Sequence, residues 1–561
     1  MTNDAVTLAA VPTRTTVPAR PAAPAALDRL ALRFRRGRLL VALLALGVAW
    51  RLVRFAAGFP FWGDEAFVGV NFLVRDFAGM LRPLEWGQIV PLGSLWANLA
   101  AARLLGVNEW SLRLVQTAAG IATLLLFWRF AGRAVPRRPA VLATGIFAAS
   151  YFLVRHGAEI KPYATDALVS LALTRLGWAV YTHPRCIGRW TALIAFAAAS
   201  VWCSYPAVFV AGAVGMLLAL VAVRQGASRA AVLRCVLYGG VLAASFVAMY
   251  VTFARPAAQA AARIVDTGMW KPTFPPLEDP LRIPLWLVAM HTGRMLAYPV
   301  GGEAPGSAGT LALVIIGAMA LARRNAPLLL LLLGPLPLAL IAAALEKYPY
   351  GGSVRTMIYM APAFCLLAGL GAWWLILRAT RLLKLPASAA RHALNGVVTV
   401  LCAGMAAGAI ADIARPYQSK VERDGRAAIR ELARASRPAD RWVVFNATTP
   451  VAYAPWLGDW RGTGGQFVFD VARLAPVPLA WAPPPDEIDA AADGRLWLLA
   501  YRGVRVEFPE AQFAAYRAAI ERRFEPVGEP RRTLLKQREG RIEAIDIHGY
   551  VPRHAPAAPP R

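Results

Sequence analysis

The sequence predicts a polytopic α-helical membrane protein that ends in a small α/β domain. Hydrophobic residues make up 57% of its 561 residues, a composition too apolar for a single soluble core. Several apolar runs reach about 18 residues or more, and a helix needs about 20 residues to cross a hydrocarbon core of about 30 Å. Short groups of arginines recur between these runs, as they do in the cytoplasmic loops of membrane proteins.

The net charge and the cysteines argue against two other classes of protein. A charge of +28 can indicate nucleic-acid binding, but here the arginines alternate with apolar runs, so we expect no nucleic-acid partner. The five cysteines lie in or beside apolar segments without paired spacing. They indicate neither a disulfide framework nor a zinc site.

The N-terminal region is expected to stay in the cytoplasm. Residues 1–38 mix Ala, Pro, Thr and Arg without periodicity, which is typical of a disordered tail. Four arginines between positions 33 and 38 hold this end inside, and the first span follows at Leu39–Ala57. The segment FWGDEA, Phe61–Ala66, therefore emerges on the outer face.

The segment Pro91–Leu105 decides the rest of the topology. As a helix it would extend only about 22 Å, too short to cross about 30 Å, so we interpret it as a juxtamembrane helix. About eleven spans then remain, and every arginine-rich short loop falls in the cytoplasm. The expected spans form a transmembrane domain over residues 39–414 and are 39–57, 110–130, 140–154, 164–181, 190–204, 206–223, 231–253, 308–322, 327–345, 357–377 and 395–414.

Residues 415–551 are expected to form an extracytoplasmic α/β domain. Arg441–Phe445 and Arg495–Tyr501 have the composition of buried strands, and Pro509–Phe524 has helical spacing of apolar and basic residues. The stretches 532–537 and 543–550 suit a closing hairpin. No phosphate-binding glycine loop or metal cluster is seen in this region, so we assign it no chemistry, and residues 552–561 are expected to be disordered.

Unusual polar residues gather in the loops that this topology places outside. Ionisable groups beside hydrocarbon are costly unless they are paired or functional, so such a gathering indicates a site. Carboxylates together with cations suit a reaction in which an acid deprotonates an attacking hydroxyl while cations hold a departing phosphate. The candidate residues are Asp64, Glu65, Glu85, Gln88, Glu159, Lys161, Asp166, Trp270, Arg294, Tyr350, Arg355 and Tyr359.

The order of these features resembles that of the C-type glycosyltransferases, which include the protein O-mannosyltransferases and the lipid A aminoarabinose transferases. The shared features are an Asp-Glu pair after the first span, a juxtamembrane helix, an Asp opening the helix after the third span, and a late Tyr/Arg loop. The likeness covers roughly the membrane half to two-thirds of the chain. The loops HGAEIKPYATD and YPYGGSVR are also similar to the HS-x-x-x-KQYS-x-D and YPFGGR-type loops of bacterial membrane proteins whose acceptor we cannot name.

The resemblance implies an inverting transfer of a sugar from a polyprenyl-phosphate carrier to a lipid, glycan or protein acceptor. The reaction would occur at the outer face of the bacterial cytoplasmic membrane, without a nucleotide, a cofactor or a metal. In this comparison Asp64 matches the general base, Glu65 is a supporting group and Asp166 matches a second acid.

Further roles follow from the same comparison. Candidates for the donor phosphate are Lys161, Arg294, Arg355, Tyr350 and Tyr359, and candidates for sugar or acceptor contacts are Glu85, Gln88, Glu159 and Trp270. One departure is that the aminoarabinose transferases carry a Lys-Pro pair in the first loop, where this chain has Gln88 and Pro91. Phosphate binding must then rest on other cations, such as Arg82 or Lys161.

Each candidate also has a purely structural interpretation. Asp64 fits the N-cap of a helix over 65–80, and Asp166 fits the first turn of a helix, where an anion is favoured. Lys161 and Glu159 could form a local ion pair. Arg294 could lie on an amphipathic helix over 283–300 that rests on lipid, and Arg355 could anchor the end of its span.

Two functions of other classes remain open at this point. A transporter or flippase of a lipid-linked sugar would carry polar residues through the membrane midplane and usually an internal repeat, and we see no such repeat. A non-catalytic relative would only bind the lipid carrier, and the Asp-Glu pair argues against it without excluding it.

Overall fold

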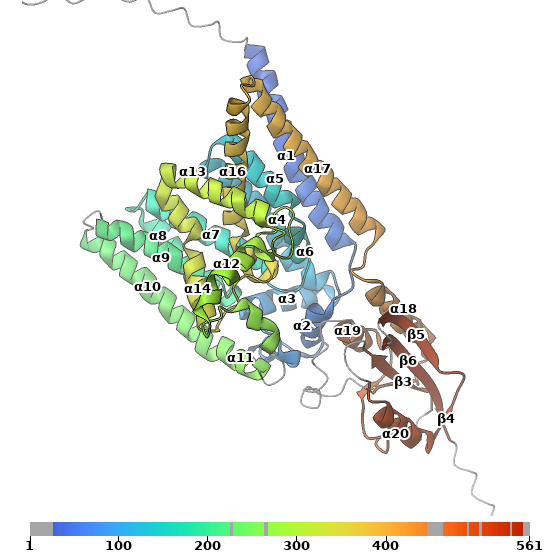
Figure 1. The fold of residues 1–561 in the computed structure, drawn as a ribbon. Helices are drawn as coiled ribbons and strands as arrows, with labels where there is room; N and C mark the ends of the chain where they lie inside the picture. The colour runs from blue at the N-terminus through green and yellow to red at the C-terminus, as the bar shows by residue number, and fades with distance from the viewer. Residues whose placement is uncertain are drawn as a thin grey trace, which may run out of the picture. The chain divides into compact units, whose positions relative to one another are not determined.

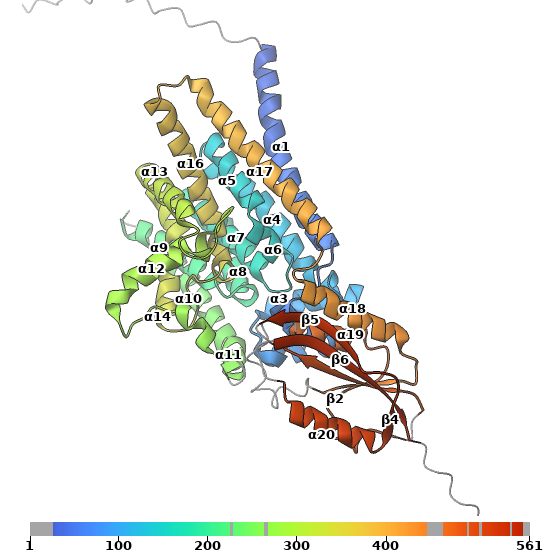
Figure 2. The same cartoon turned by 45° about the vertical axis from the view of Figure 1, so that its right-hand side comes forward.

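The structure is a computed structural model that describes residues 26–224, 228–262, 267–445, 464–490, 493–503, 508–538 and 541–553. The chain divides into two units, Met1–Ala42 and Leu43–Arg561. The first unit contributes the start of helix α1 (Ala26–Ala56). The second unit holds the remaining helices and a small sheet (Figures 1 and 2).

Helix α1 begins earlier than the sequence analysis expects. The tail was expected to extend to residue 38, but Ala26 already opens the helix, because the stretch ALDRLALRFRRGR is rich in the strong helix formers Ala, Leu and Arg. Residues 1–25 of the expected tail lie outside the described residues.

The described residues of the membrane part are mostly helical, with longer stretches of loop and 3-10 turn at 75–91 and 293–307. The helices after α1 are α2 (Gly63–Val74), α3 (Leu92–Leu105), α4 (Ser111–Ala134), α5 (Arg137–Ala149), α6 (Tyr151–Gly157), α7 (Tyr163–Thr182), α8 (Ile187–Cys203), α9 (Ala207–Arg224), α10 (Arg229–Met249), α11 (Arg255–Ala262), α12 (Ile283–Thr292), α13 (Ala308–Leu333), α14 (Pro335–Ala344), α15 (Val354–Met357), α16 (Ala361–Leu382) and α17 (Ala387–Ala414).

Among the described residues, seven helical segments are long and apolar enough to cross a membrane, or eight if α5 and α6, bent by 53°, count as one span. The expected number of about eleven is roughly consistent with this, because each expected span coincides with helix. The spans expected at 308–322 and 327–345 share one segment, Ala308–Ala344, which has a non-helical residue at Asn325, φ −156°. The expected span at 190–204 is the shorter helix α8. Helix α3 confirms the short helix expected near Pro91.

Helices α13 and α16 approach each other closely through two glycines. A Cβ atom added at Gly317 would lie 1.9 Å from the carbonyl oxygen of Leu367, and one added at Gly371 would lie 2.0 Å from that of Leu313. Only glycine allows the two backbones this separation. The contact fixes the direction of α16, which follows the short helix α15 that carries Arg355.

The C-terminal part confirms the expected α/β domain. Its elements are α18 (Lys420–Ala435), β1 (Arg441–Val444), α19 (Gly464–Leu474), β2 (Leu479–Trp481), β3 (Leu496–Arg502), α20 (Glu510–Glu521), β4 (Phe524–Pro526), β5 (Arg531–Arg538) and β6 (Arg541–Pro552). The strand order is β2-β1-β3-β6-β4, and β5 also pairs with β6. Strands β1, β2 and β3 are parallel, whereas β6 is antiparallel to β3, β4 and β5.

Each face of this sheet has its own core. Alternate residues of β1 point to opposite faces, as in any strand, so Trp442 and Val444 pack under α18 and α19 while Val443 packs under α20. Figure 2 shows α18 and α19 on one side of β5 and β6 and α20 on the other. The hairpin expected from 532–537 and 543–550 is the β5–β6 pair. Residues 554–561 of the expected C-terminal tail lie outside the described residues, while β6 continues to Pro552.

Candidate active site

Asp64 and Arg355 form a buried ion pair. Arg355 Nη1 donates to Asp64 Oδ2 over 2.7 Å, and the side chains are only 7% (Asp64) and 18% (Arg355) exposed. Asp64 lies in the first turn of α2, where the helix dipole favours a carboxylate. It is not the N-cap that the structural interpretation suggested, because Trp62 occupies that position.

Glu65 lies behind this pair and has a different partner. Arg113 at the start of α4 binds it with two nitrogens, from Nε to Oε1 at 2.8 Å and from Nη2 to Oε2 at 2.5 Å. The backbone N–H of Ile160 also donates to Oε1, at 3.0 Å. A bidentate pair of this kind fixes both orientation and position, so Glu65 ties α2 to α4 and to the loop before α7.

Arg113 was not among the candidate residues predicted from the sequence. A signal was available, because Arg113 is a charged residue within an expected span, and such residues usually face a partner inside the protein. The partner itself could not be identified, since Glu65 and Arg113 are 48 residues apart.

The loop between α6 and α7 brings two further candidates to the same region. Glu159 accepts from His156 Nδ1 at 2.9 Å and from Arg155 Nε at 3.3 Å. Burial opposes ionisation of Glu159, but His156 and Arg155 outweigh it and lower the pKa of this carboxyl to about 2. A local ion pair between Lys161 and Glu159 was one structural interpretation of the sequence. In the structure Glu159 instead pairs with His156 and Arg155.

Lys161 extends from the same loop and donates from Nζ to Gln88 Oε1 at 2.6 Å. Burial lowers the pKa of Lys161, although the Asp64 carboxylate partly opposes this. The sequence candidates Gln88 and Lys161 are thus in direct contact. Among the described residues the hydrogen bond of this buried ammonium goes to a neutral amide, so the ammonium retains the capacity to attract an anion.

Two tryptophans flank Arg355. The Arg355 guanidinium carbon lies 5.4 Å from the ring centroid of Trp62 and 5.7 Å from that of Trp270. Both contacts are within the range of cation–π attraction. Trp270, a candidate sugar contact from the sequence, therefore lies beside Arg355, and Trp62, which was not among the candidates, lies there as well.

Asp166 lies in the first turn of α7 and is 6% exposed. Within the described part of the chain its Oδ1 atom has no hydrogen-bond partner. The hydroxyls of Ser204 and Tyr205 lie nearby, in the turn between α8 and α9, and the Ser204 hydroxyl interacts with the Asp166 carboxyl. A buried carboxyl oxygen without a well-formed hydrogen bond is costly to the fold.

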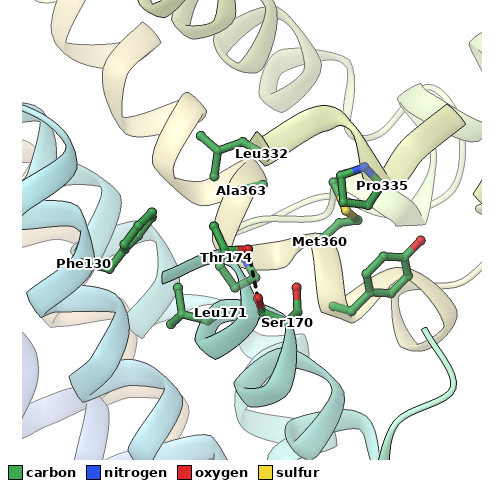
Figure 3. A pocket seen from close by; sticks show the side chains of 10 residues that line it. Phe130, Ser170, Leu171, Thr174, Leu332, Pro335, Met360 and Ala363 are labelled. Carbon is green, nitrogen blue, oxygen red and sulfur yellow. Dashed lines mark hydrogen bonds between the residues drawn. The ribbon is translucent and has the colours of Figure 1, made fainter. Parts of the chain in front are cut away.

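The two candidate tyrosines lie on either side of α15. Tyr350 is buried, and its hydroxyl meets His291 Nε2 at 3.2 Å; burial raises the pKa of Tyr350. Tyr359 is buried as well and lies at a pocket between α7, α14 and α16 (Figure 3). The pocket is mostly apolar and is lined by Phe130, Ser170, Leu171, Thr174, Leu332, Pro335, Tyr359, Met360, Pro362 and Ala363.

Two candidates lie outside the group formed by Asp64, Lys161 and Arg355. Arg294 is paired with Glu303, and both side chains are largely exposed, at 49% and 76%. Glu85 accepts from Arg75 at 3.1 Å and is 41% exposed. Neither makes a contact with Asp64, Lys161 or Arg355 among the described residues, because the loops that carry them turn toward other partners.

Within the described ranges, no group of three or more His, Cys, Asp and Glu side chains is arranged to hold a metal ion. The five cysteines are unpaired. The expectation that the reaction uses neither metal nor cofactor stays a prediction.

Comparison with known proteins bears on the membrane part and on the fold. Residues 90–253 match the model of the family described as dolichyl-phosphate-mannose-protein mannosyltransferase. No curated relative matches the chain. The structure is similar to that of ArnT from Cupriavidus metallidurans in the apo state, with 12% identity and a TM-score of 0.50 over 93% of this chain and 98% of that chain.

Two further structures show weaker similarity. ArnT from the same organism bound to undecaprenyl phosphate matches with 12% identity and a TM-score of 0.49, over 93% of this chain and 98% of that chain. The apo oligosaccharyltransferase of Archaeoglobus fulgidus matches with 13% identity and a TM-score of 0.47, over 79% of this chain and 64% of that chain. The resemblance drawn from the sequence is confirmed: in its family match and in its fold, this multi-pass membrane protein is similar to the C-type glycosyltransferases.

Proposed function

We propose that the protein is an inverting glycosyltransferase that moves a sugar from a polyprenyl-phosphate carrier to an acceptor hydroxyl or amine. The family match of residues 90–253 supports glycosyl transfer as the general activity. The carrier class follows from ArnT, to which the fold is similar and which binds undecaprenyl phosphate. The sugar and the acceptor, whether lipid, glycan or protein, are left open.

The observation that carries this proposal is the buried Asp64–Arg355 ion pair. It combines a carboxylate that can accept a proton with a guanidinium whose planar donors suit a phosphate. Lys161 adds a second cation near Asp64. The Asp64 carboxylate partly opposes the lowering of the Lys161 pKa that burial causes. Trp62 and Trp270 supply aromatic faces on which a pyranose ring can stack.

In the proposed reaction the acceptor attacks the anomeric carbon of the donor. The new glycosidic bond forms as the bond from that carbon to the phosphate oxygen breaks, and the electron pair leaves with the polyprenyl phosphate. Asp64 takes the proton of the acceptor. Arg355 and Lys161 stabilise the charge that develops on the departing phosphate. Attack from the face opposite the phosphate inverts the anomeric configuration.

The phosphate of the carrier also affects Asp64, because it binds the same guanidinium. Before the donor binds, Asp64 holds Arg355 at 2.7 Å. A phosphate that competes for the guanidinium weakens this bond and leaves the Asp64 carboxylate available to the acceptor proton. Glu65 stays bound to Arg113 throughout and keeps the first turn of α2 in place.

The reaction is proposed for the outer face of the bacterial cytoplasmic membrane, with the N-terminus inside and the C-terminal domain outside. This follows from the distribution of arginines in the short loops. The partners would be the polyprenyl-phosphate sugar, the surrounding lipid and the acceptor, with no nucleic acid involved.

The deciding experiment uses the purified full chain in lipid vesicles with radiolabelled polyprenyl-phosphate sugars and candidate acceptors. A glycosyltransferase yields labelled acceptor and free polyprenyl phosphate. A transporter or flippase instead moves intact donor across the bilayer, and a protein that only binds the carrier does neither. Label that stays on the carrier while crossing the membrane would overturn the proposal. Glu85→Gln, outside the group around Asp64, is the control variant.

A further inference from the structure

The C-terminal domain makes a direct contact with the helix that carries the two acids. Helix α19 packs along α2 (Figure 1). Its residue Phe469 is fully buried, and the ring centroid lies 4.7 Å from that of Phe61, which precedes α2. Phe469 belongs to the core formed by α2, α3 and the loop before α7, and not to the core of its own domain.

The position of Phe469 on α19 explains this arrangement. Phe467 and Val471 are four residues apart and share one helix face, which packs into the core beneath α18. Phe469 lies between them in sequence and therefore points to the opposite face. A helix with an apolar residue on its outward face needs a partner there, and α2 provides it.

Helix α2 has a matching feature at Gly69. A Cβ atom added at Gly69 would lie 3.0 Å from both Cδ2 and Cε2 of Phe469 and 3.2 Å from Cε2 of Phe61. Any side chain larger than glycine would press against both rings. The close approach therefore depends on the glycine of one domain and the phenylalanine of the other.

The contact continues to Glu65 through two further side chains. The guanidinium carbon of Arg113 lies 4.6 Å from the centroid of the Phe61 ring, and Arg113 holds Glu65 with two hydrogen bonds. Phe469, Phe61, Arg113 and Glu65 thus form one packed series that ends beside Asp64.

A buried charge cluster fixes α19 at the same place. Glu109, four residues before Arg113, is 2% exposed and pairs with Arg426 of α18 and with Arg473 of α19, the latter at 3.4 Å. Removing one partner of a buried pair is strongly destabilising. The domain is therefore held at Glu109 as well as at Phe469.

We propose that Phe469 is a positioning residue: through Phe61 and Gly69 it fixes α2, and with it the Asp64 and Glu65 carboxylates. This inference rests on the proposed function for its catalytic consequence, but not for its structural content. The C-terminal domain would then support the reaction by positioning α2, although the groups proposed to react all belong to the membrane part.

The first test is hydrogen–deuterium exchange of α2 in the full chain. Phe469→Ala should accelerate exchange of the backbone amides over residues 63–74. Phe513→Ala is the matched control, because it removes the same side chain, 3% exposed, from the core on the other face of the sheet. Unchanged exchange in Phe469→Ala, or an equal increase in Phe513→Ala, would overturn the proposal.

The second test is kinetic. Phe469→Ala should lower kcat by up to about 10²-fold, the cost of a displacement near 1 Å at reacting groups, with a smaller change in the KM for the donor. Phe469→Leu should restore part of the loss. An equal loss of kcat in Phe513→Ala would assign the effect to domain stability and contradict the positioning role.

A third variant covers the case in which Phe469→Ala does not fold. Gly69→Ala adds a methyl group against the Phe469 ring and should reproduce the fall in kcat. In the Phe469→Ala background the contact of this methyl group with the Phe469 ring is gone and the contact with Phe61 remains, so the two effects should be less than additive. Additive effects would contradict a direct contact. If wild type transfers no sugar at all, the proposed function fails, and the exchange test still decides whether Phe469 positions α2.

Discussion

Arg355 donates a 2.7 Å hydrogen bond to Asp64 although 291 positions of sequence separate the two residues. The bond joins the start of α2 to α15, the short helix that begins at the end of the YPYGGSVR stretch. The group proposed to accept a proton and the group proposed to hold a phosphate are therefore one ion pair before any substrate binds. Loss of one partner should affect the two functions differently.

Asp64→Asn should lower sugar transfer by about 10² to 10⁴, the usual contribution of a general base. Binding of the polyprenyl-phosphate sugar should be retained or tightened, because Arg355 loses the carboxylate that competes with the phosphate. Both are measured on the purified variant, by transfer of label and by a donor-binding assay. Transfer at the wild-type rate would remove Asp64 from its role.

Arg355→Gln should weaken donor binding much more than Arg294→Gln. A hydrogen bond to a charged group contributes about 1.5–3 kcal/mol, which corresponds to roughly 10- to 100-fold in affinity. Arg294 was also a candidate phosphate ligand from the sequence, but it is half-exposed and paired with Glu303, so its replacement should change affinity little. Equal losses in the two variants would show that the Asp64 partner is not the phosphate ligand.

Arg113→Leu should destabilise the protein by about 3–5 kcal/mol, because it leaves the Glu65 carboxylate buried without its cation. The double variant Arg113→Leu with Glu65→Leu should recover part of that loss, since it removes both charges. Thermal unfolding in detergent, followed for all three proteins, measures the effect. A double variant less stable than Arg113→Leu would contradict this account of the pair.

Donor binding should weaken as the pH rises, and it should do so below the pH at which an exposed lysine titrates. Burial lowers the pKa of Lys161, and only its protonated form attracts the phosphate. The favourable interaction is complete at pH values below that pKa and is lost as the pH rises through it. Lys161→Arg stays protonated and should flatten the profile of donor KM against pH. The same pH dependence in both proteins would exclude Lys161 as its source.

A reporter fused after Ala414 should be found outside the cytoplasm. The expectation rests on the arginine-rich short loops, all of which lie inside when α3 is a juxtamembrane helix. A matched fusion after Leu382, at the end of α16, should report the cytoplasm. A cytoplasmic signal after Ala414 would reverse the orientation and place the group around Asp64 on the other face.

Elements whose structure depends on residues close together in the sequence could be predicted from the local pattern of apolar residues. The short helix α3, the strands β1 and β3 and the β5–β6 hairpin follow from apolar periodicity and length. The first helix shows the limit of this reasoning, because composition and a cluster of arginines indicated a tail where helix formers extend α1 back to Ala26.

The same limit applies to the candidate site. Residue type and loop order indicated Asp64, Lys161 and Arg355, but they also indicated Arg294 and Glu85 as candidates. Charge alone cannot tell which cation faces which acid. Only the folded chain shows that Arg294 pairs with Glu303 and that Arg355 pairs with Asp64.

By itself, the sequence determined that this is a helical membrane protein with a small α/β domain and with acids and cations in the loops between its helices, because length, hydropathy and spacing are local properties. The tertiary structure decided which of those groups meet. It also showed that Arg113 is the partner of Glu65. Phe469, from the C-terminal domain to which no chemistry was assigned from the sequence, contacts Phe61. Such contacts join residues tens to hundreds of positions apart, and their geometry is set by how helices and domains pack, which no spacing along the chain records.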